Sequence, residues 1–220
     1  MKYSLPLLPL LLISGISSCQ QPAKKTAINN VKVGGNCEGC EAIYESPVPF
    51  EQLNEVDTLP DFNETGPRIE ISGTIYKADG KTPAPGVVLY VYHTDQKGLY
   101  PKKDGAKGWG SRHGYIRGWV KTDQSGYYKF YTLVPASYPG GTNPKHIHPV
   151  IKEPGYSEYW IDEFVFDDDP VLPQEERTRP NPVGGAGVLK TVPIAIGMKD
   201  GMLRATRNII LGLNVRNYPK

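Results

Sequence analysis

The sequence predicts an all-β protein: an antiparallel β-sandwich with an irregular N-terminal arm and long loops. Three observations support this fold class. Short segments alternate apolar and polar side chains, which is typical of half-buried strands. Turn residues separate these segments, and the 220-residue chain holds 24 glycines and 21 prolines. Segments with the period of an amphipathic helix are scarce. Evenly spaced strands joined by turns are the pattern of a sandwich.

The first 19 residues are expected to be a targeting segment rather than part of the fold. Lys2 provides a positive start, residues 5–16 form a short apolar run, and Cys19 closes the segment after Ser17 and Ser18. The run is too short to span a bilayer comfortably. This arrangement resembles a bacterial lipoprotein signal, which predicts lipidation of Cys19. An ordinary secretory signal and a membrane-anchor helix are the alternatives.

Residues 20–36 are polar and are expected to form a flexible tether, and residues 37–67 are expected to form an N-terminal arm. Cys37 and Cys40 stand in C-x-x-C spacing at the start of this arm. In an exported protein such a pair is expected to form a disulfide. A redox role would require a thioredoxin-like βαβ pattern, which the sequence lacks. A structural disulfide is therefore the favoured interpretation, and two reduced thiols are the alternative.

A single β-sandwich domain is predicted over residues 68–215. The expected strands, in chain order, cover residues 68–76, 87–93, a segment between 114 and 121, 127–134, 146–152 and 159–166, with a final hairpin from 189–196 and 202–213. Strand 87–93 is apolar on both faces, so we expect it in the middle of a sheet. The acidic turn at 167–169 could suggest calcium, but a solvated turn is favoured. Residues 171–187 predict a long loop.

Charge and composition limit the classes of partner. The chain has 25 basic and 23 acidic residues and a formal net charge of +2. It has no basic block and no RNA-reading motif, so no nucleic-acid partner is predicted.

Two histidines separated by one residue are the most informative feature of the sequence. His146 and His148 begin a strand-like segment, and alternate strand residues share a face. Their imidazoles would therefore point the same way and could share one metal ion, while Ile147 would point into the core. Histidine pairs in strands are also often surface or hydrogen-bonded core residues. Histidine alone does not choose among iron, copper, zinc and nickel.

Two tyrosines, each fixed before a proline, accompany the histidines. Tyr138 lies eight residues before His146, and Tyr100 lies in the loop that follows the central strand. The residue before a proline disfavours the helical conformation, so both tyrosines are expected in extended loops. A phenolate oxygen together with imidazole nitrogen favours a hard ion such as iron(III) over zinc.

The order of these motifs resembles the intradiol ring-cleavage dioxygenases, the family of protocatechuate 3,4-dioxygenase and catechol 1,2-dioxygenase. The resemblance covers residues 68–170 and rests on the segments G-T-I-Y-K-A-D-G-K-T-P-A-P-G-V, T-D-Q-S-G-Y-Y-K-F, G-L-Y, P-A-S-Y-P, P-K-H-I-H and F-V-F-D-D-D-P. It implies that Tyr100, Tyr138, His146 and His148 bind a mononuclear non-haem iron(III). It also implies that a catechol substrate displaces Tyr100.

The chain departs from the family at Asn143. The family carries an arginine three residues before the first histidine, and this residue is expected to affect catalysis because its charge stabilises electron-rich intermediates. Removing one aimed cation can cost about 2.7–4 kcal/mol of barrier. Lys145, Arg117 or Arg112 could supply the charge instead. The family's phenylalanine after the second histidine is also replaced, by Pro149.

The predicted function is therefore iron(III)-dependent intradiol cleavage of a small aromatic diol with O2. We expect an exported lipoprotein in the cell envelope, held to the membrane on the periplasmic or outer-surface face, with homo-oligomerisation possible. The pocket is expected to be lined by residues 100–119 and the Tyr138 loop. The alternatives are a non-catalytic surface-anchored binding module and a pseudo-enzyme that retains a metal site.

Overall fold

The computed structural model describes residue 1 and residues 30–194 and 201–220, and the elements below lie within these ranges. Cys19 and residues 20–29 of the expected tether lie outside the described residues, as does the tip expected for the final hairpin at Asp200. Among the described residues, no helix is both long enough and apolar enough to cross a membrane.

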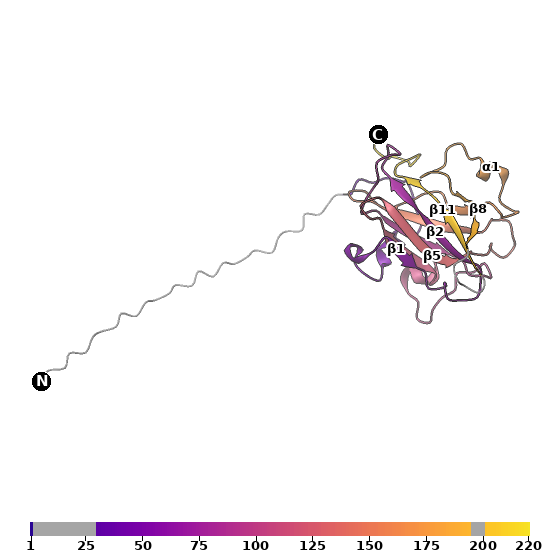
Figure 1. Ribbon diagram of the computed structural model, residues 1–220, viewed down its shortest axis with the longest axis horizontal. Coiled ribbons are helices and arrows are strands. Elements are labelled where there is room, and N and C mark those ends of the chain that lie inside the picture. Colours follow the sequence, from indigo (N-terminus) through magenta and orange to yellow (C-terminus); the bar gives the residue numbers. More distant parts are fainter. Residues whose placement is uncertain (2–29, 195–200) are drawn as a thin grey trace.

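Two six-stranded sheets pack face to face, as the sequence predicts (Figure 1). The first sheet has the order β1-β5-β2-β11-β10, with β12 also paired to β2, and the second has the order β4-β3-β6-β8-β9, with β7 also paired to β6. The strands are β1 (Val56–Thr58), β2 (Arg68–Tyr76), β3 (Val88–His93), β4 (Arg117–Lys121), β5 (Tyr127–Leu133), β6 (His146–Lys152), β7 (Tyr159–Trp160), β8 (Phe164–Phe166), β9 (Val188–Leu189), β10 (Val192–Ile194), β11 (Met202–Thr206) and β12 (Ile209–Ile210). Short helices are η1 (Cys40–Glu45), η2 (Phe50–Gln52), η3 (Gly108–Ser111) and α1 (Gln174–Arg177).

The main core lies between the two sheets and follows the alternation of each strand. On β6, Ile147 and Ile151 are fully buried in this core, and on β2 Ile69 and Ile71 are buried opposite them in the same cluster. Burying one such side chain contributes roughly 1.5–3 kcal/mol. Because the side-chain period of a strand is two, His146, His148 and Val150 face away from this core.

A second apolar cluster covers part of that outer face. The N-terminal arm brings Cys40, Ala42 and Ile43 against Tyr90, Trp119 and Val150 of the second sheet. The Trp119 indole donates a hydrogen bond from Nε1 to the Ile43 carbonyl oxygen at 2.9 Å. The structure joins Cys37 and Cys40 by a disulfide, with their Cα atoms 5.6 Å apart. The arm thus covers part of the outer face of the second sheet, beside the histidines of β6.

The structure differs from the predicted elements in strand pairing, in the arm and in the final hairpin. Strands β1 and β5, β2 and β11, and β8 and β9 pair in parallel, so the sheets are mixed. Strand β1 belongs to the arm, which is therefore not wholly irregular. The expected final hairpin is present as β10 and β11, but the chain then leaves it, and β12 runs parallel to β2. Local alternation predicts that a strand exists but not which distant strand pairs with it.

The predicted strand 159–166 is interrupted. Its first part, β7, pairs with Val150 and Ile151, and its second part, β8, pairs with His146 and Ile147. The residues between the two parts leave the hydrogen-bonded ladder opposite His148. This interruption places Glu163 beside the His148 side chain, as described below.

Candidate metal centre

The side chains of Tyr100, Tyr138, His146 and His148 converge on one point outside the second sheet. The Tyr100 and Tyr138 hydroxyl oxygens are 2.5 Å apart, and His148 Nε2 lies 2.9 Å and 3.2 Å from them. His146 Nε2 lies 3.1 Å from Tyr138 Oη and 3.1 Å from His148 Nε2. The sequence places the two histidines on one face, and the fold brings both loop tyrosines to them.

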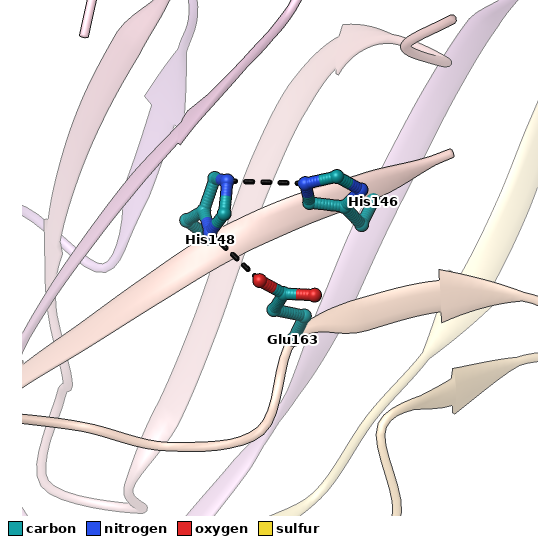
Figure 2. Close-up of side chains that lie close together, drawn as sticks. All are labelled: His146, His148 and Glu163. Carbon is teal, nitrogen blue, oxygen red and sulfur yellow. Dashed lines mark hydrogen bonds and ion pairs between the residues drawn. The ribbon is translucent and has the colours of Figure 1, made fainter. Parts of the chain in front are cut away.

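Both imidazoles are held with the same ring nitrogen facing the cluster. His146 Nδ1 is 2.6 Å from the Pro144 carbonyl oxygen, and His148 Nδ1 is 2.9 Å from Glu163 Oε1 (Figure 2). A carbonyl oxygen accepts only, so His146 Nδ1 carries the proton and donates it. The Glu163 carboxylate also accepts only, so His148 Nδ1 is expected to donate its proton to it. Each Nε2 is then unprotonated and presents a lone pair to the cluster.

This donor set fits a hard transition-metal ion. Two nitrogen lone pairs only 3.1 Å apart repel each other unless a proton or a cation lies between them. Two phenol oxygens complete the set, and as phenolates they would supply the anionic oxygen that iron(III) prefers. The four residues would hold the ion, and the hydrogen bonds at Nδ1 would fix the orientation of both rings.

Glu163 is a residue of the candidate site to which the sequence does not point. It forms a potential three-residue metal group with His146 and His148, whose ligand atoms all lie within 4.8 Å of one another. Since its carboxylate contacts Nδ1 rather than Nε2, its geometry is that of a positioning residue. Burial acts to raise the pKa of Glu163, but the pKa is lowered overall, and the hydrogen bond with His148 is the largest cause of the lowering.

Burial also shifts the pKa values of Tyr100, Tyr138 and His146 in the cluster. Burial is the largest cause that raises the pKa of Tyr100, followed by its hydrogen bond with Tyr138. The pKa of Tyr138 is raised by burial as well. The pKa of His146 is lowered, first by burial and then by the neighbouring His148, so this imidazole is neutral and ready to bind a metal ion.

Two further aromatic rings form a stack with the His148 imidazole. The Tyr92 ring stacks on His148 with centroids 4.6 Å apart, and His113 stacks on Tyr92 with centroids 3.8 Å apart. Tyr92 is the Cα partner of His148 in the antiparallel register of β3 and β6, which explains the first contact. His113 receives a further contact from Tyr90, whose hydroxyl lies 2.9 Å from His113 Nδ1.

A glycine allows the two tyrosine loops to meet. Gly98 has φ +73°, and a Cβ at this position would overlap the Ser137 carbonyl oxygen, one residue before Tyr138. Hydrogen bonds from the Thr94 hydroxyl to the Ala136 carbonyl oxygen at 2.6 Å and from Gln96 to Val134 at 2.7 Å tie the same two segments together.

Asn143 lies on the wall of the pocket that contains the histidines, and its side chain is exposed. The three cations considered as substitutes for the family's arginine each pair with a carboxylate. Among the described residues, Lys145 Nζ lies 2.9 Å from Asp168, Arg117 lies 2.7 Å from Glu45, and Arg112 lies 2.5 Å from Glu38. The expectation that one of them serves the cluster gains no support.

The acidic turn is solvated only in part, because Asp167 and Asp168 are exposed whereas Asp169 is buried. Asp167 pairs with Arg177, Asp168 pairs with Lys145, and Asp169 accepts hydrogen bonds from the backbone. The three carboxylates therefore serve separate partners.

The pocket has a volume of about 730 Å³, and its walls differ from the prediction. Tyr138 and both histidines contribute to it, but the expected lining by residues 100–119 is wrong. The other walls come from Asn36, from residues 37–39 at the start of the arm, and from residues 160–165 and 173–188. These segments are distant in sequence and carry no local signal of their role.

Comparisons with known proteins agree with this fold. A family model described as Dioxygenase matches residues 44–180. A catechol 1,2-dioxygenase 1 of Acinetobacter lwoffii is 37% identical over 87 residues, which is 39% of this chain and 26% of that protein. A catechol 1,2-dioxygenase of Acinetobacter baylyi is 27% identical over 126 residues, 47% of this chain and 39% of that protein. These matches span less than half of either relative.

Solved structures show the same fold at low identity. The dioxygenase domain of a dioxygenase–carbohydrate-binding protein fusion from Streptomyces sp. SirexAA-E has a TM-score of 0.52 and 20% identity, covering 70% of this chain and 85% of that one. A catechol 1,2-dioxygenase from Acinetobacter sp. ADP1 has a TM-score of 0.52 and 18% identity, covering 71% and 56%.

Proposed function

The chain belongs to the intradiol dioxygenase family, and from this premise we propose that it uses non-haem iron(III) and O2 to open a catechol-type ring between its two hydroxyl-bearing carbons. The observation that carries the proposal is the convergence of two phenol oxygens and two imidazole nitrogens within 3.2 Å of their neighbours. Bound iron(III) would act as a Lewis acid that draws electron density from the catecholate ring and makes it reactive toward O2.

The protein's own residues would bind the substrate and take up one of its two protons, and the other would pass to solvent water. A catechol loses protons when both of its oxygens bind a metal ion. Tyr100 Oη is a suitable acceptor for one of them, because burial and the Tyr138 hydrogen bond both raise the pKa of Tyr100. Tyr138, His146 and His148 would keep their places, and Glu163 would hold the His148 ring in orientation through Nδ1.

Purified protein reconstituted with iron(III) is expected to be red-brown, since tyrosinate-to-iron charge transfer absorbs visible light. Metal analysis should find one iron per chain, and catechol should yield a ring-opened dicarboxylate with uptake of one O2. Tyr138→Phe should shift the colour, whereas Tyr127→Phe on β5 should not. A colourless protein that retains zinc, or an aldehyde product from cleavage beside the diol, would count against the proposal.

A non-catalytic binding module or a pseudo-enzyme is the second candidate, and Asn143 is the observation that favours it. Position 143 offers no charge to stabilise an electron-rich intermediate, and each of the three other cations considered already has a carboxylate partner. A protein that binds iron but opens no catechol under O2 would support this candidate.

We also propose a lipid anchor at Cys19 that holds the protein in the cell envelope, on the strength of the N-terminal sequence pattern. The full chain produced in a bacterium that processes lipoproteins should partition into the detergent phase, and Cys19→Ala should remove this behaviour. Equal partitioning of the two forms would contradict the anchor.

A further inference from the structure

The pocket extends well beyond the space that a single catechol ring needs. A cavity of roughly 150 Å³ is large enough for benzene, and pockets of roughly 300–1,000 Å³ hold ligands of several rings. The pocket beside His146 and His148 measures about 730 Å³. A one-ring substrate would leave most of it filled with water.

The strand register places an aromatic side chain in this extra space. Val150 lies two residues beyond His148 on the same face of β6, about 7 Å along the strand. Trp160 is the Cα partner of Val150 in the antiparallel pair of β6 and β7, so its side chain emerges on this same face. Trp160 also lines the pocket.

Trp160 differs from the other two tryptophans. Trp119 is 8% exposed with its Nε1 bound to a carbonyl oxygen, and Trp109 packs beneath the Arg112 guanidinium with a separation of 4.8 Å. Trp160 is 41% exposed, and within residues 30–194 and 201–220 it has no aromatic or cationic stacking partner. An exposed, unstacked indole on a pocket wall is suited to pack against an aromatic ring.

The charges on the pocket walls disfavour anionic substituents. The acidic and guanidinium side chains of the lining are Glu38, Asp162, Glu163, Glu176, Arg177 and Arg179, so the acidic ones exceed the guanidiniums by two. Arg177 already contacts the Asp167 side chain and two carbonyl oxygens. Arg179 contacts Glu176 and lies 3.7 Å from Asp162. Both guanidiniums are thus occupied by the protein's own acceptors.

We propose that Trp160 forms a subsite for a second aromatic ring, which selects catechols that carry a further aryl group and no anionic substituent. The inference rests on the proposed function, because it takes the diol end of the substrate to lie at the four-residue cluster. The second ring would then lie over the indole of Trp160, which pairs with Val150, two residues beyond His148 on β6.

The first test compares three substrates with the full, iron-loaded chain: catechol, 4-phenylcatechol and 3,4-dihydroxybenzoate. We expect the highest kcat/KM for 4-phenylcatechol and the lowest for the carboxylated compound. Trp160→Ala should reduce the preference for 4-phenylcatechol over catechol by about tenfold, and Trp160→Phe by less, since a smaller ring remains. Val192→Ala, an exposed change in the other sheet, is the matched control and should preserve the preference.

A second variant tests the charge argument. Glu176→Gln removes one acceptor from Arg179 and should improve the kcat/KM for 3,4-dihydroxybenzoate by about fivefold. No improvement, or a wild-type preference for the carboxylated compound, would overturn the exclusion of anionic substrates.

A binding measurement separates failure of this inference from failure of the proposed function. Quenching of tryptophan fluorescence by 4-phenylcatechol should occur in the metal-free protein and should be largely lost in Trp160→Phe. Quenching without ring opening of any catechol would support the subsite and contradict the proposed function. Ring opening with an unchanged preference in Trp160→Ala would overturn the subsite alone.

Discussion

His148→Ala is expected to abolish stable iron binding and, with it, ring cleavage. His148 Nε2 lies 2.9–3.2 Å from three other donor atoms of the cluster, and its ring is fixed by Glu163 on one side and stacked on Tyr92. Loss of a residue that only orients a metal ligand costs about 10–100-fold in affinity. Loss of the ligand itself should therefore exceed 100-fold. Iron content after dialysis against a chelator, together with the visible absorption, measures the effect.

Lys145→Ala is the matched control for this change. Lys145 lies next to His146 in the sequence, but its ammonium group pairs with Asp168, 2.9 Å away, and lies 5.3 Å from the Phe166 ring. The variant should retain iron and colour. If His148→Ala keeps one iron per chain with unchanged absorption, the ion is bound elsewhere and the four-residue cluster is not its site.

Asn143→Arg is expected to accelerate cleavage of catechol, by up to about a hundredfold. The side chain of residue 143 is exposed on the pocket wall, three residues before His146, so an arginine there could direct its charge at the bound ring. A donor or charge aimed at the developing negative charge contributes about 10²–10³ in kcat when its geometry is right. Single-turnover kinetics with iron-loaded protein measure this effect separately from binding.

Thr142→Arg controls for charge alone, because it adds the same cation one residue away on the same pocket wall. Asn143→Gln controls for side-chain length. Equal acceleration by both arginine variants would indicate a general electrostatic effect. A fast wild type that does not respond to Asn143→Arg would mean that another group already stabilises the transition state.

The central strands and the shared face of the histidines could be predicted because they depend on local patterns. Ile147 points into the core and His146 and His148 point away from it, as alternation requires. The role of Glu163 could not be predicted in this way. The sequence predicts an uninterrupted strand over 159–166, whereas the break that brings Glu163 to His148 arises because two short strands, β7 and β8, pair with different parts of β6.

The surroundings of the cluster could not be predicted from local sequence patterns either. The stacking of His113 on Tyr92 joins a loop to a strand, and the disulfide arm reaches the pocket through packing on Tyr90 and Val150. Sequence spacing identified candidate cations near the site, but ion-pair choice depends on the fold. Arg112 contacts Glu38 in the distant arm, so proximity in sequence was a poor guide.

The close approach at Gly98 determines how the centre can change shape. With the Tyr100 and Tyr138 loops packed backbone to backbone, neither loop can swing outward without breaking the contacts that hold the other. We therefore expect Tyr100 to leave a bound ion by rotation about its own side-chain bonds. Rotamer changes of exposed side chains take on the order of picoseconds to nanoseconds, and loop motions take on the order of nanoseconds to microseconds. Tyr100 is partly buried and packed against Tyr92. The four-residue cluster would then change shape through the rotamer of one tyrosine, while both loops keep their contacts.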